Sequence, residues 1–576
     1  MKKAPLNYGH LVLTLGLLTL ATTAYSVWRH YSPLPFNDQW DGAIGAYLQA
    51  SQNPWHALFA QHNEHRLAVP RLLFFADLRY FGGRNVMLLT VNLVLAGLLA
   101  LTFVRIAVGQ DRKIERRAQL SIAGAALIFG YSWIQQENFT WGFQGQWFAV
   151  YLFALTAFYS LELASRARAK GQARESFWWL IAALLSATVS AYSMSSGVLV
   201  FPVLLVQAMY SRFRPAALGF IFLVGVLVWV AYFNDWHSPT SNGTVMAAWL
   251  QHPLDAFRYV LLYLGAPARS ARLGAISAHL GVASAYTIGA LVLVSLAVFV
   301  VKAATSDSFE VRATSLLAFS LFIVGNAAIT AGGRLWLGLE FALSSRYTTA
   351  ALAVWTALIA FAAVNARSAK EYRWISAIGG IAVVLVLSAQ RSALDSPRDE
   401  VYPRLVAGLA LRAHVYDPEI TRAVYPFPDQ LIAKASAAEK AGLSIFAPAS
   451  PDYLVPPAQV RAASSCEGAV DAVSPTTTPG VYRASGWIYD ENDKRVPRHV
   501  IVTDIDGATI GSGVTGGTSS EGKDAVGRRA TYSGWTAFFR ARAEGDIQVA
   551  ARAPGGTFCK IKSAVSASAR PATSAH

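Results

Sequence analysis

The sequence returns repeatedly to apolar runs that are long enough to cross a lipid bilayer, and this feature constrains the fold more than any other. A hydrocarbon core of about 30 Å is crossed by a helix of roughly 17 to 25 apolar residues. With 54% hydrophobic and 14% charged residues, the chain is also too apolar for an ordinary soluble protein. We predict eleven membrane-spanning helices, at 9–27, 86–108, 120–133, 148–163, 177–192, 198–209, 217–233, 286–301, 315–331, 348–364 and 375–387.

The positive charges indicate how these spans are oriented. Lys and Arg gather in short segments such as 165–174 and 211–214, as expected for loops on the cytoplasmic side of a membrane. The basic start and the apolar run at 9–27 also fit a signal peptide, but the residues that follow are a poor cleavage site, so we interpret the run as an uncleaved first span. We therefore predict a cytoplasmic N-terminus and a periplasmic C-terminus. The same distribution explains the net charge of +15 without nucleic-acid binding.

The polar remainder of the chain divides into two predicted parts and a tail. Residues 392–460 have helical periodicity interrupted by Pro and Asp, which predicts a helical extracytoplasmic connector. Residues 461–566 alternate apolar and polar positions between turn residues, which predicts a small antiparallel β-sandwich. The two cysteines, Cys466 and Cys559, bracket this domain and are candidates for a disulfide if it faces an oxidising compartment. Residues 567–576 are predicted to be disordered.

The segment between the first two spans carries more chemistry than a connector needs. Within the transmembrane domain, 1–391, this predicted outer loop at 28–85 holds acids, bases and aromatic residues, whereas a simple connection is usually short. Asp38 and Asp41 are three residues apart, so on a helix they would share one face. Two interpretations stay open: Asp38 caps a helix that begins near Trp40, or the pair supplies a general base or a ligand for a divalent cation.

A second group of polar residues follows in the same loop. His62, Glu64 and His65 lie in the sequence HNEHR, whose spacing is not that of the HExxH motif of zinc proteases. Substrate binding, a metal site and ordinary polar contacts in a folded loop are the alternatives for these three residues. Arg66 and Arg71 lie on the predicted outer side, where planar guanidinium groups suit phosphate oxygens. Contact with lipid headgroups is the simpler alternative.

A later outer segment and a break in the apolar pattern add candidates. Glu137, Trp141 and Gln144 lie in QQENFTWGFQ, at the outer end of the third span. Tryptophans there form an interfacial belt or stack on a sugar ring, so we consider these residues for substrate binding. The Ser/Gly-rich sequence SMSSG at 193–197 interrupts two predicted spans, and irregular backbone at membrane depth is tolerated where it lines a cavity.

The last cluster of candidates precedes the tenth span. Arg334 follows the ninth span, and Arg346 and Tyr347 stand where the chain re-enters the membrane, near the expected headgroup plane. An arginine in this position either extends its charge to the interface or binds the phosphate of a lipid-linked substrate. We therefore predict these residues as part of a donor-phosphate site.

This layout resembles the GT-C glycosyltransferases, in particular bacterial members that use polyprenyl-phosphate sugars. The resemblance covers residues 1–392 in layout: a first span, an acidic outer loop with Asp38 and Asp41, about eleven helices and a folded extracytoplasmic tail. In that family an Asp or Glu of the first outer loop sits at the catalytic centre, so the resemblance implies that Asp38 or Asp41 is the general base. Arginines would offset the charge on the departing phosphate, and a divalent cation is left open.

The resemblance implies a hexosyl or pentosyl transferase of the bacterial inner membrane. It would move a sugar from a polyprenyl-phosphate donor to a cell-envelope glycan or lipid acceptor on the outer side, in contact with membrane lipids. The main alternative is a transporter or flippase, which would place its ionisable residues near the middle of spans. A polysaccharide polymerase or ligase, such as one acting on O-antigen, would carry its main polar loop late in the chain. A protein that only binds partners through its β-domain is a further alternative.

Overall fold

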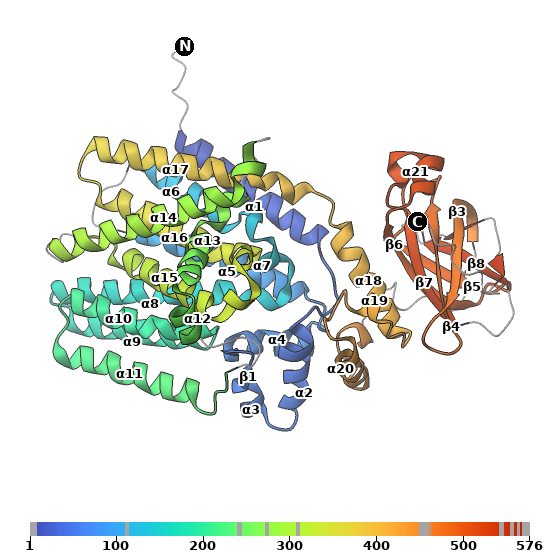
Figure 1. Ribbon diagram of the computed structural model, residues 1–576, viewed down its shortest axis with the longest axis horizontal. Coiled ribbons are helices and arrows are strands. Elements are labelled where there is room, and N and C mark those ends of the chain that lie inside the picture. Colours follow the sequence, from blue (N-terminus) through green and yellow to red (C-terminus); the bar gives the residue numbers. More distant parts are fainter. Residues whose placement is uncertain are drawn as a thin grey trace, which may run out of the picture. The chain divides into compact units, whose positions relative to one another are not determined.

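The computed structural model in Figure 1 divides the chain into two compact units. The first unit contains Met1–Trp28, Asn53–Leu73 and Leu88–Asp395, and the second contains Arg29–Gln52, Phe74–Met87 and Ser396–His576. The predicted outer loop is therefore shared between the two units. The structure describes residues 8–109, 115–238, 245–270, 276–306, 311–448, 460, 462–540, 546–552, 558–561 and 565–566. The predicted disordered tail, 567–576, lies outside the described residues.

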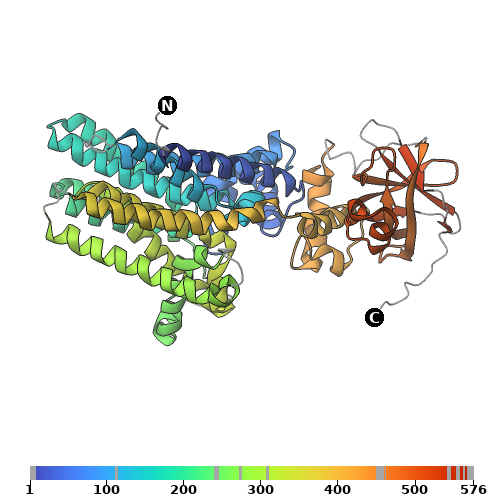
Figure 2. The same ribbon diagram turned by 90° about the horizontal axis from the view of Figure 1, so that it is seen from above.

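Helices make up the first unit, and Figures 1 and 2 show the long ones running alongside one another. The α-helices that lie wholly or partly in this unit are α1 (Tyr8–Arg29), α3 (Pro54–Phe59), α4 (Ala68–Tyr80), α5 (Val86–Val108), α6 (Arg116–Gly130), α7 (Gln136–Thr140), α8 (Gly145–Ala169), α9 (Ala173–Ala191), α10 (Val200–Tyr210), α11 (Pro215–Phe233), α12 (Val245–Gln251), α13 (Pro253–Arg269), α14 (Ile276–Thr305), α15 (Thr314–Arg334), α16 (Thr348–Asn365) and α17 (Ala369–Gln390). Short 3-10 segments join several of them: η2 (Trp133–Gln135), η3 (Gly142–Gln144), η4 (Ser195–Leu199), η5 (Leu335–Leu337), η6 (Leu339–Leu343), η7 (Ser345–Tyr347) and η8 (Arg391–Leu394).

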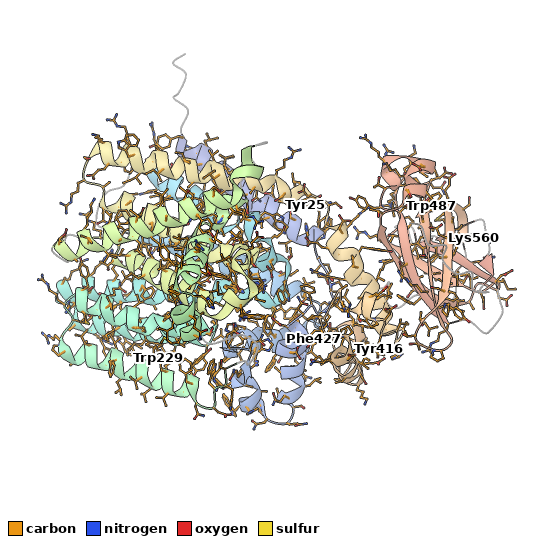
Figure 3. All side chains as sticks on the ribbon, viewed as in Figure 1. Tyr25, Trp229, Tyr416, Phe427, Trp487 and Lys560 are labelled. Carbon is orange, nitrogen blue, oxygen red and sulfur yellow. A yellow bond between two sulfur atoms is a disulfide. The ribbon has the colours of Figure 1, made fainter. Side chains whose placement is uncertain are left out.

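Eight helices in the described part of the chain are long and apolar enough to cross a membrane. They contain α1, α5, α8, α11, α14, α15, α16 and α17. The exposed sides of these helices are apolar: Phe222, Leu227 and Val230 on α11 are each about 60% exposed, and Trp229 of the same helix is labelled in Figure 3. Apolar surface of this extent indicates a membrane protein. The other three predicted spans lie in α6, α9 and α10, which are helical but not among the eight.

Small residues allow the helices of this unit to approach closely. A Cβ atom added to Gly265 of α13 would lie 1.8 Å from the carbonyl oxygen of Ala285 in α14. One added to Gly289 of α14 would lie 2.0 Å from that of Leu261. Only glycine fits where two helix backbones meet at this distance, a common feature of helix packing in membranes. Helix α13, which carries polar and charged residues, is thereby fixed among the apolar helices.

The second unit joins two short N-terminal segments to the polar C-terminal part of the chain. Its helices are η1 (Gln39–Gly45), α2 (Ala46–Ala50), α18 (Arg398–Arg412), α19 (Pro418–Thr421), α20 (Pro428–Lys440), η9 (Ser444–Phe446), α21 (Ser520–Val526) and η10 (Arg528–Ala530). Leu34, Trp40 and Ile44 share one hydrophobic core with Leu409 and Leu431 of the connector helices. Burial of these apolar side chains holds the two parts of the sequence together.

A small β-domain completes the second unit. Its strands are β3 (Ala462–Pro475), β4 (Val481–Tyr489), β5 (His499–Thr503), β6 (Thr509–Gly517), β7 (Gly534–Arg540), β8 (Asp546–Arg552), β9 (Phe558–Ile561) and β10 (Val565–Ser566). The sheet order is β10-β8-β5-β6-β7-β4-β3-β9, and an additional pairing of β8 with β9 closes the sheet on itself. The prediction of an antiparallel two-layer sandwich therefore differs from the structure, which has one closed sheet and one parallel pair, β3 with β9.

A disulfide joins the first strand of this domain to β9. Cys466 and Cys559 are bonded with their Cα atoms 5.3 Å apart, and both side chains are buried in the β-domain core. Trp487, which Figure 3 labels, is also buried in this domain, beside Tyr489. Strands β5 and β7 are buried at nearly every position and not at alternate ones, although the sequence predicts them from alternation.

Candidate functional site

A short β-hairpin, with two strands of two residues each, contains the polar HNEHR sequence in the first unit. Strand β1 (Gln61–His62) pairs with β2 (His65–Arg66), so His62 and His65 are cross-strand neighbours. Asn63 has a φ of 50°, which Asn tolerates better than most residues and which tight hairpin turns require. The turn places Glu64 at the tip of the hairpin. His62 packs against Phe143, with ring centroids 5.5 Å apart.

Two buried arginines hold this hairpin in place. The Arg66 guanidinium donates hydrogen bonds to the carbonyl oxygens of Phe59, Tyr232 and Asn234, the first at 2.7 Å. Arg71 is 2% exposed and donates to the carbonyl oxygen of Leu58 at 3.1 Å. Burial, reinforced by the charge of Arg66, lowers the pKa of Arg71 to about 10. Because these guanidinium groups are directed at backbone carbonyls, we leave both out of the phosphate site that we propose below.

Glu64 forms an ion pair with Arg334, although 270 residues separate them in the sequence. Arg334 stands at the end of α15, where the helix gives way to η5. Both side chains are half-buried, with exposed fractions of 24% and 21%. Burial alone would raise the pKa of Glu64, but the neighbouring His65 and Arg334 outweigh it and hold that pKa below its usual value. Glu64 is therefore an ionised carboxylate in a partly dehydrated setting.

His65 connects Glu64 to the Ser/Gly-rich break of the bundle. Its Nδ1 accepts hydrogen bonds from the Oγ of Ser195 at 2.7 Å and from the backbone N–H of the same residue at 3.2 Å. Nδ1 therefore lacks a proton in the neutral ring, and Nε2 carries it, 3.5 Å from a Glu64 oxygen. Burial lowers the pKa of His65, and Arg334 lowers it further, against the opposing effect of Glu64.

The break itself is fixed by a close backbone approach. It forms η4 (Ser195–Leu199), between α9 and α10. A Cβ atom on Gly197 would lie 2.0 Å from the carbonyl oxygen of Ser190, so no larger residue fits without a shift. The predicted irregular segment is therefore present, and it supplies Ser195 to the polar cluster.

Arg346 brings a second guanidinium and a second acid to the same unit. Its Nε lies 3.6 Å from an oxygen of Glu137, and its guanidinium carbon lies 5.3 Å from the ring centroid of Phe341. The amide of Asn138 donates to the carbonyl oxygen of Arg346 at 2.8 Å. Two segments that the sequence analysis treated separately, QQENFTWGFQ and SSRY, are thus adjacent in the structure.

Tyr347 lies at the point where these charged groups meet. The side chain is 3% exposed, and Arg346, Arg334 and Glu64 all lie close enough to act on it electrostatically. Its ring stacks on Tyr263 of α13 at a centroid distance of 5.2 Å and contacts Trp147 of α8 at 5.5 Å. The two arginines, the carboxylate and Tyr347 therefore lie together, against the rings of neighbouring helices. We use the name arginine cluster for six residues: Glu64, His65, Ser195, Arg334, Arg346 and Tyr347.

A chain of buried polar groups continues inward from Tyr347. The amide of Asn326 on α15 donates to the hydroxyl of Tyr263 at 2.9 Å and to that of Tyr151 at 3.2 Å. Tyr259 of α13 is also buried. The sequence analysis missed these tyrosines because each looks like an ordinary apolar-face residue of a helix. Their spacing of four in α13, at 259 and 263, was the available signal.

The remaining predicted substrate residues are packed inside the unit. Trp141 is 5% exposed and stacks on Phe143, with centroids 5.8 Å apart, so its ring face is covered by protein. Gln144 is 1% exposed, and its Oε1 is buried without a hydrogen-bond partner. Glu137 is 30% exposed and, like Asn138 of this segment, contacts Arg346 of the arginine cluster. Trp141 and Gln144 are buried and therefore have a packing role in this segment.

Asp38 and Asp41 belong to the second unit. Both stand at the start of η1, a π-helical segment, which begins at Gln39 without a capping bond from the Asp38 side chain. Asp41 accepts a hydrogen bond from the Tyr425 hydroxyl at 2.7 Å and pairs with Lys434 of α20. Burial, together with this bond, raises the pKa of Tyr425. The contacts of Asp41 thus join the N-terminal segment of the second unit to its connector helices.

Asp77 is a third acid of the same unit, and the sequence analysis did not single it out. It is 2% exposed, its Oδ2 accepts from the Asn85 backbone N–H at 3.4 Å, and its Oδ1 accepts no hydrogen bond. Burial raises its pKa to about 6, against the opposing effects of this bond and of Arg84. Tyr31, whose pKa burial raises to about 12, lies close enough to Asp77 to sense its charge.

Within the described residues, no group of three or more His, Cys, Asp or Glu side chains is arranged to hold a metal ion. Glu64, Glu137 and Asp41 are paired with arginine or lysine instead, and His65 is bonded to Ser195. Neither models of known protein families, nor curated proteins, nor solved structures match this chain significantly. The geometry of the two units is therefore the basis for the proposals that follow.

Proposed function

We propose that the chain is a membrane glycosyltransferase that moves a sugar from a polyprenyl-phosphate donor to an envelope glycan or lipid. The observation that carries the proposal is the arginine cluster, in which Arg334, Arg346 and the carboxylate of Glu64 surround Tyr347 at helix ends of the apolar unit. Two guanidinium groups beside one carboxylate suit a reaction in which a phosphate departs while a proton is removed. A lipid-linked donor explains why these groups belong to the unit with the apolar helices.

In this mechanism Arg334 and Arg346 bind the donor phosphate and Glu64 acts as the general base. The acceptor hydroxyl attacks the anomeric carbon, and the bond from that carbon to the phosphate oxygen breaks with its electron pair going to the phosphate. Glu64 takes the proton of the hydroxyl. When the phosphate binds Arg334, it offsets part of the positive charge that lowers the pKa of Glu64. Burial then raises that pKa toward a value suited to a general base.

His65 and Ser195 position the base in this scheme. The bonds from Ser195 to Nδ1 leave the proton of His65 on Nε2, directed at Glu64. A fixed donor beside the carboxylate sets the orientation of Glu64 toward the acceptor. The GT-C resemblance implies that Asp38 or Asp41 is the general base, and this assignment is the alternative. We prefer Glu64 because Asp41 is bonded within the second unit.

The location that we propose is the bacterial inner membrane, with eleven spans, a cytoplasmic N-terminus and a periplasmic β-domain. The Cys466–Cys559 disulfide supports this orientation, since disulfides persist in oxidising compartments such as the periplasm. The positive charge of the short loops supports it independently. The active site would then face the outer leaflet.

The proposal is tested in a strain that lacks the gene and is complemented with single variants. We expect Glu64→Gln to remove the sugar from the envelope glycan, measured by mass spectrometry, while membrane levels of the protein are unchanged. Asp41→Asn and the exposed control Glu175→Gln should keep the modification. Loss in Asp38→Asn or Asp41→Asn with a normal Glu64→Gln would instead assign the base to the family position. A flippase would leave an undecorated lipid-linked sugar on the inner leaflet.

A second candidate function is acyl transfer through a serine nucleophile. One observation favours it: Ser195 is hydrogen-bonded to His65, and Glu64 lies 3.5 Å from the other ring nitrogen, an order of groups that can activate a serine hydroxyl. A fluorophosphonate probe distinguishes the two reactions, since it labels an activated serine covalently. Labelling that disappears in Ser195→Ala would support the acyl transferase. A glycosyltransferase would remain unlabelled.

A further inference from the structure

A cavity of about 290 Å³ lies in the second unit, where α18 packs on the β-domain. Its walls come from the last turn of α18 and from strands β4, β6 and β7. The volume is near the lower end of the range of about 300 to 1,000 Å³ for small-molecule sites. Such a space suits one small ring and not a long chain. The arginine cluster contributes none of these residues.

Among the described residues that line this cavity, two are arginines and none is an acid. Arg412 ends α18 and donates a hydrogen bond to the Ile445 carbonyl oxygen at 2.8 Å, which fixes its side chain. Glu439 acts on Arg412, but it is itself bonded to His414 at 3.0 Å. Arg540 ends β7 and is exposed. Guanidinium groups carry positive charge, so the cavity attracts an anion.

The rest of the lining combines apolar surface with hydroxyl groups. Leu409, Val481 and Phe538 are each less than 5% exposed and form an apolar wall, while Thr509 and Ser512 of β6 supply hydroxyls. Apolar contact on a ring face, hydroxyl partners at its edge and a guanidinium for an acid group are the usual requirements of an acidic sugar. A bare phosphate ion would need only the arginines.

A glycine lets β6 and β7 pair closely beside this wall. A Cβ atom on Gly511 would lie 2.3 Å from both the carbonyl oxygen of Phe538 and the Cβ of Phe539. The position therefore tolerates only glycine while β6 and β7 stay paired.

We propose that this cavity binds a sugar ring that carries a carboxylate or a phosphate, such as one unit of an acidic envelope glycan. Arg412 and Arg540 bind the anionic group, Thr509 and Ser512 bind ring hydroxyls, and the apolar wall covers one ring face. The proposal does not rest on the transfer reaction. It gives the β-domain a recognition role of its own.

The test uses the full-length protein in detergent and four small probes. Methyl glucuronide and glucose 6-phosphate carry the two kinds of acid, methyl glucoside is the neutral analogue, and inorganic phosphate lacks the ring. Saturation-transfer NMR and calorimetry measure binding to the wild type and to three variants. Arg540→Gln removes one rim charge, Ala413→Trp fills the cavity, and Arg529→Gln removes an exposed arginine that does not line it.

We expect at least one acidic sugar to bind roughly tenfold more tightly than methyl glucoside, the usual effect of a charge-assisted hydrogen bond. Arg540→Gln should weaken it by a similar factor, Ala413→Trp should abolish it, and Arg529→Gln should leave it unchanged. Preference for glucuronide or for glucose 6-phosphate then decides between carboxylate and phosphate.

Three results would overturn the proposal. One is equal binding, or no binding, of the acidic and neutral sugars. Another is inorganic phosphate binding as tightly as the sugars, because the ring would then contribute nothing. The third is wild-type affinity in Arg540→Gln. If Ala413→Trp fails to fold, Arg540→Gln and its control Arg529→Gln decide the question by themselves.

Discussion

Glu64 and Asp41 are acids of one predicted loop, yet they serve different units of the protein. Each is paired with a cation and each is partly exposed, at 24% and 34%. The partners of Asp41, Lys434 and Tyr425, come from the connector and tie the second unit together. The partners of Glu64 are Arg334, at the end of α15, and His65, in the same hairpin.

The difference lies in what surrounds each pair. Around Glu64 there is a second arginine, a histidine with a defined proton and a serine at a helix break. Such a concentration of convergent groups is more than one ion pair needs, which is why we place the chemistry there. Position in the loop alone would have favoured Asp41.

The largest expected effect comes from replacing the cation of each ion pair with an uncharged residue. Arg334→Gln should lower the rate of sugar transfer roughly 10²- to 10³-fold, because a donor to the developing phosphate charge is lost. Lys434→Gln should change the rate by less than about twofold, since it supports a structural pair only. Radiolabelled transfer by purified membranes measures both. Similar losses in the two variants would erase the distinction between the pairs.

Asp77 sharpens the comparison, because this buried acid has no cation bonded to it. Its folded pKa of about 6 exceeds the ordinary Asp value of 3.8, so the folded Asp77 binds more protons between these two values. The contribution of Asp77 to the free energy of unfolding should therefore fall as the pH rises from about 4 to about 6, by about 3 kcal/mol in all.

Urea unfolding of the full chain in detergent at several pH values measures this slope. Asp77→Asn should flatten it, whereas Asp429→Asn, which changes an exposed acid of the same unit, should leave it in place. Stability that rises over this pH range in the wild type would contradict the sign.

A smaller effect is expected from Ser195. Ser195→Ala should lower kcat roughly tenfold with little change in KM, because His65 then loses the shorter of the two hydrogen bonds to its Nδ1 and keeps only the one from the Ser195 backbone N–H. Its neighbour Ser196 is the control, since its Oγ makes no hydrogen bond in the described structure. Ser196→Ala should therefore behave as wild type. A loss of more than about 10⁴-fold in Ser195→Ala would favour the serine nucleophile instead.

The smallest effect concerns the stability that Asp41 provides. A double-mutant cycle of Asp41→Asn and Lys434→Met should give a coupling of about 0.2 to 1 kcal/mol, the usual range for partly exposed ion pairs. Thermal unfolding in detergent at low salt measures it, and added salt should reduce it. A coupling of several kcal/mol would mean that the pair is buried more deeply in solution.

Local patterns predicted much of the fold. The apolar runs became helices, and the alternating C-terminal segments became strands, because both periods are set by burial of one face. The polar cysteine-bracketed region is a β-domain as expected. Closure of its sheet through β8 and β9 was not predictable, since the residues within a strand do not indicate which other strand it pairs with.

The candidate site was predictable only in pieces. Arg334, Arg346, Tyr347, Glu64 and His65 were each chosen for their residue type. Nothing in the sequence indicated that Arg334 meets Glu64 or that Ser195 meets His65, because such pairings depend on how the helices pack. The assignment of Asp41 to a different unit is likewise a property of the packed chain and not of the loop that contains it.

Because β9 pairs with both β3 and β8, the last short strands decide whether the β-domain has open edges. A chain that stops before Phe558 would leave two long strands with unpaired backbone, surfaces on which other chains can add. The domain therefore cannot close until Phe558–Ile561 have been made. Termination before Phe558 would produce an aggregation-prone product even though the membrane helices are intact.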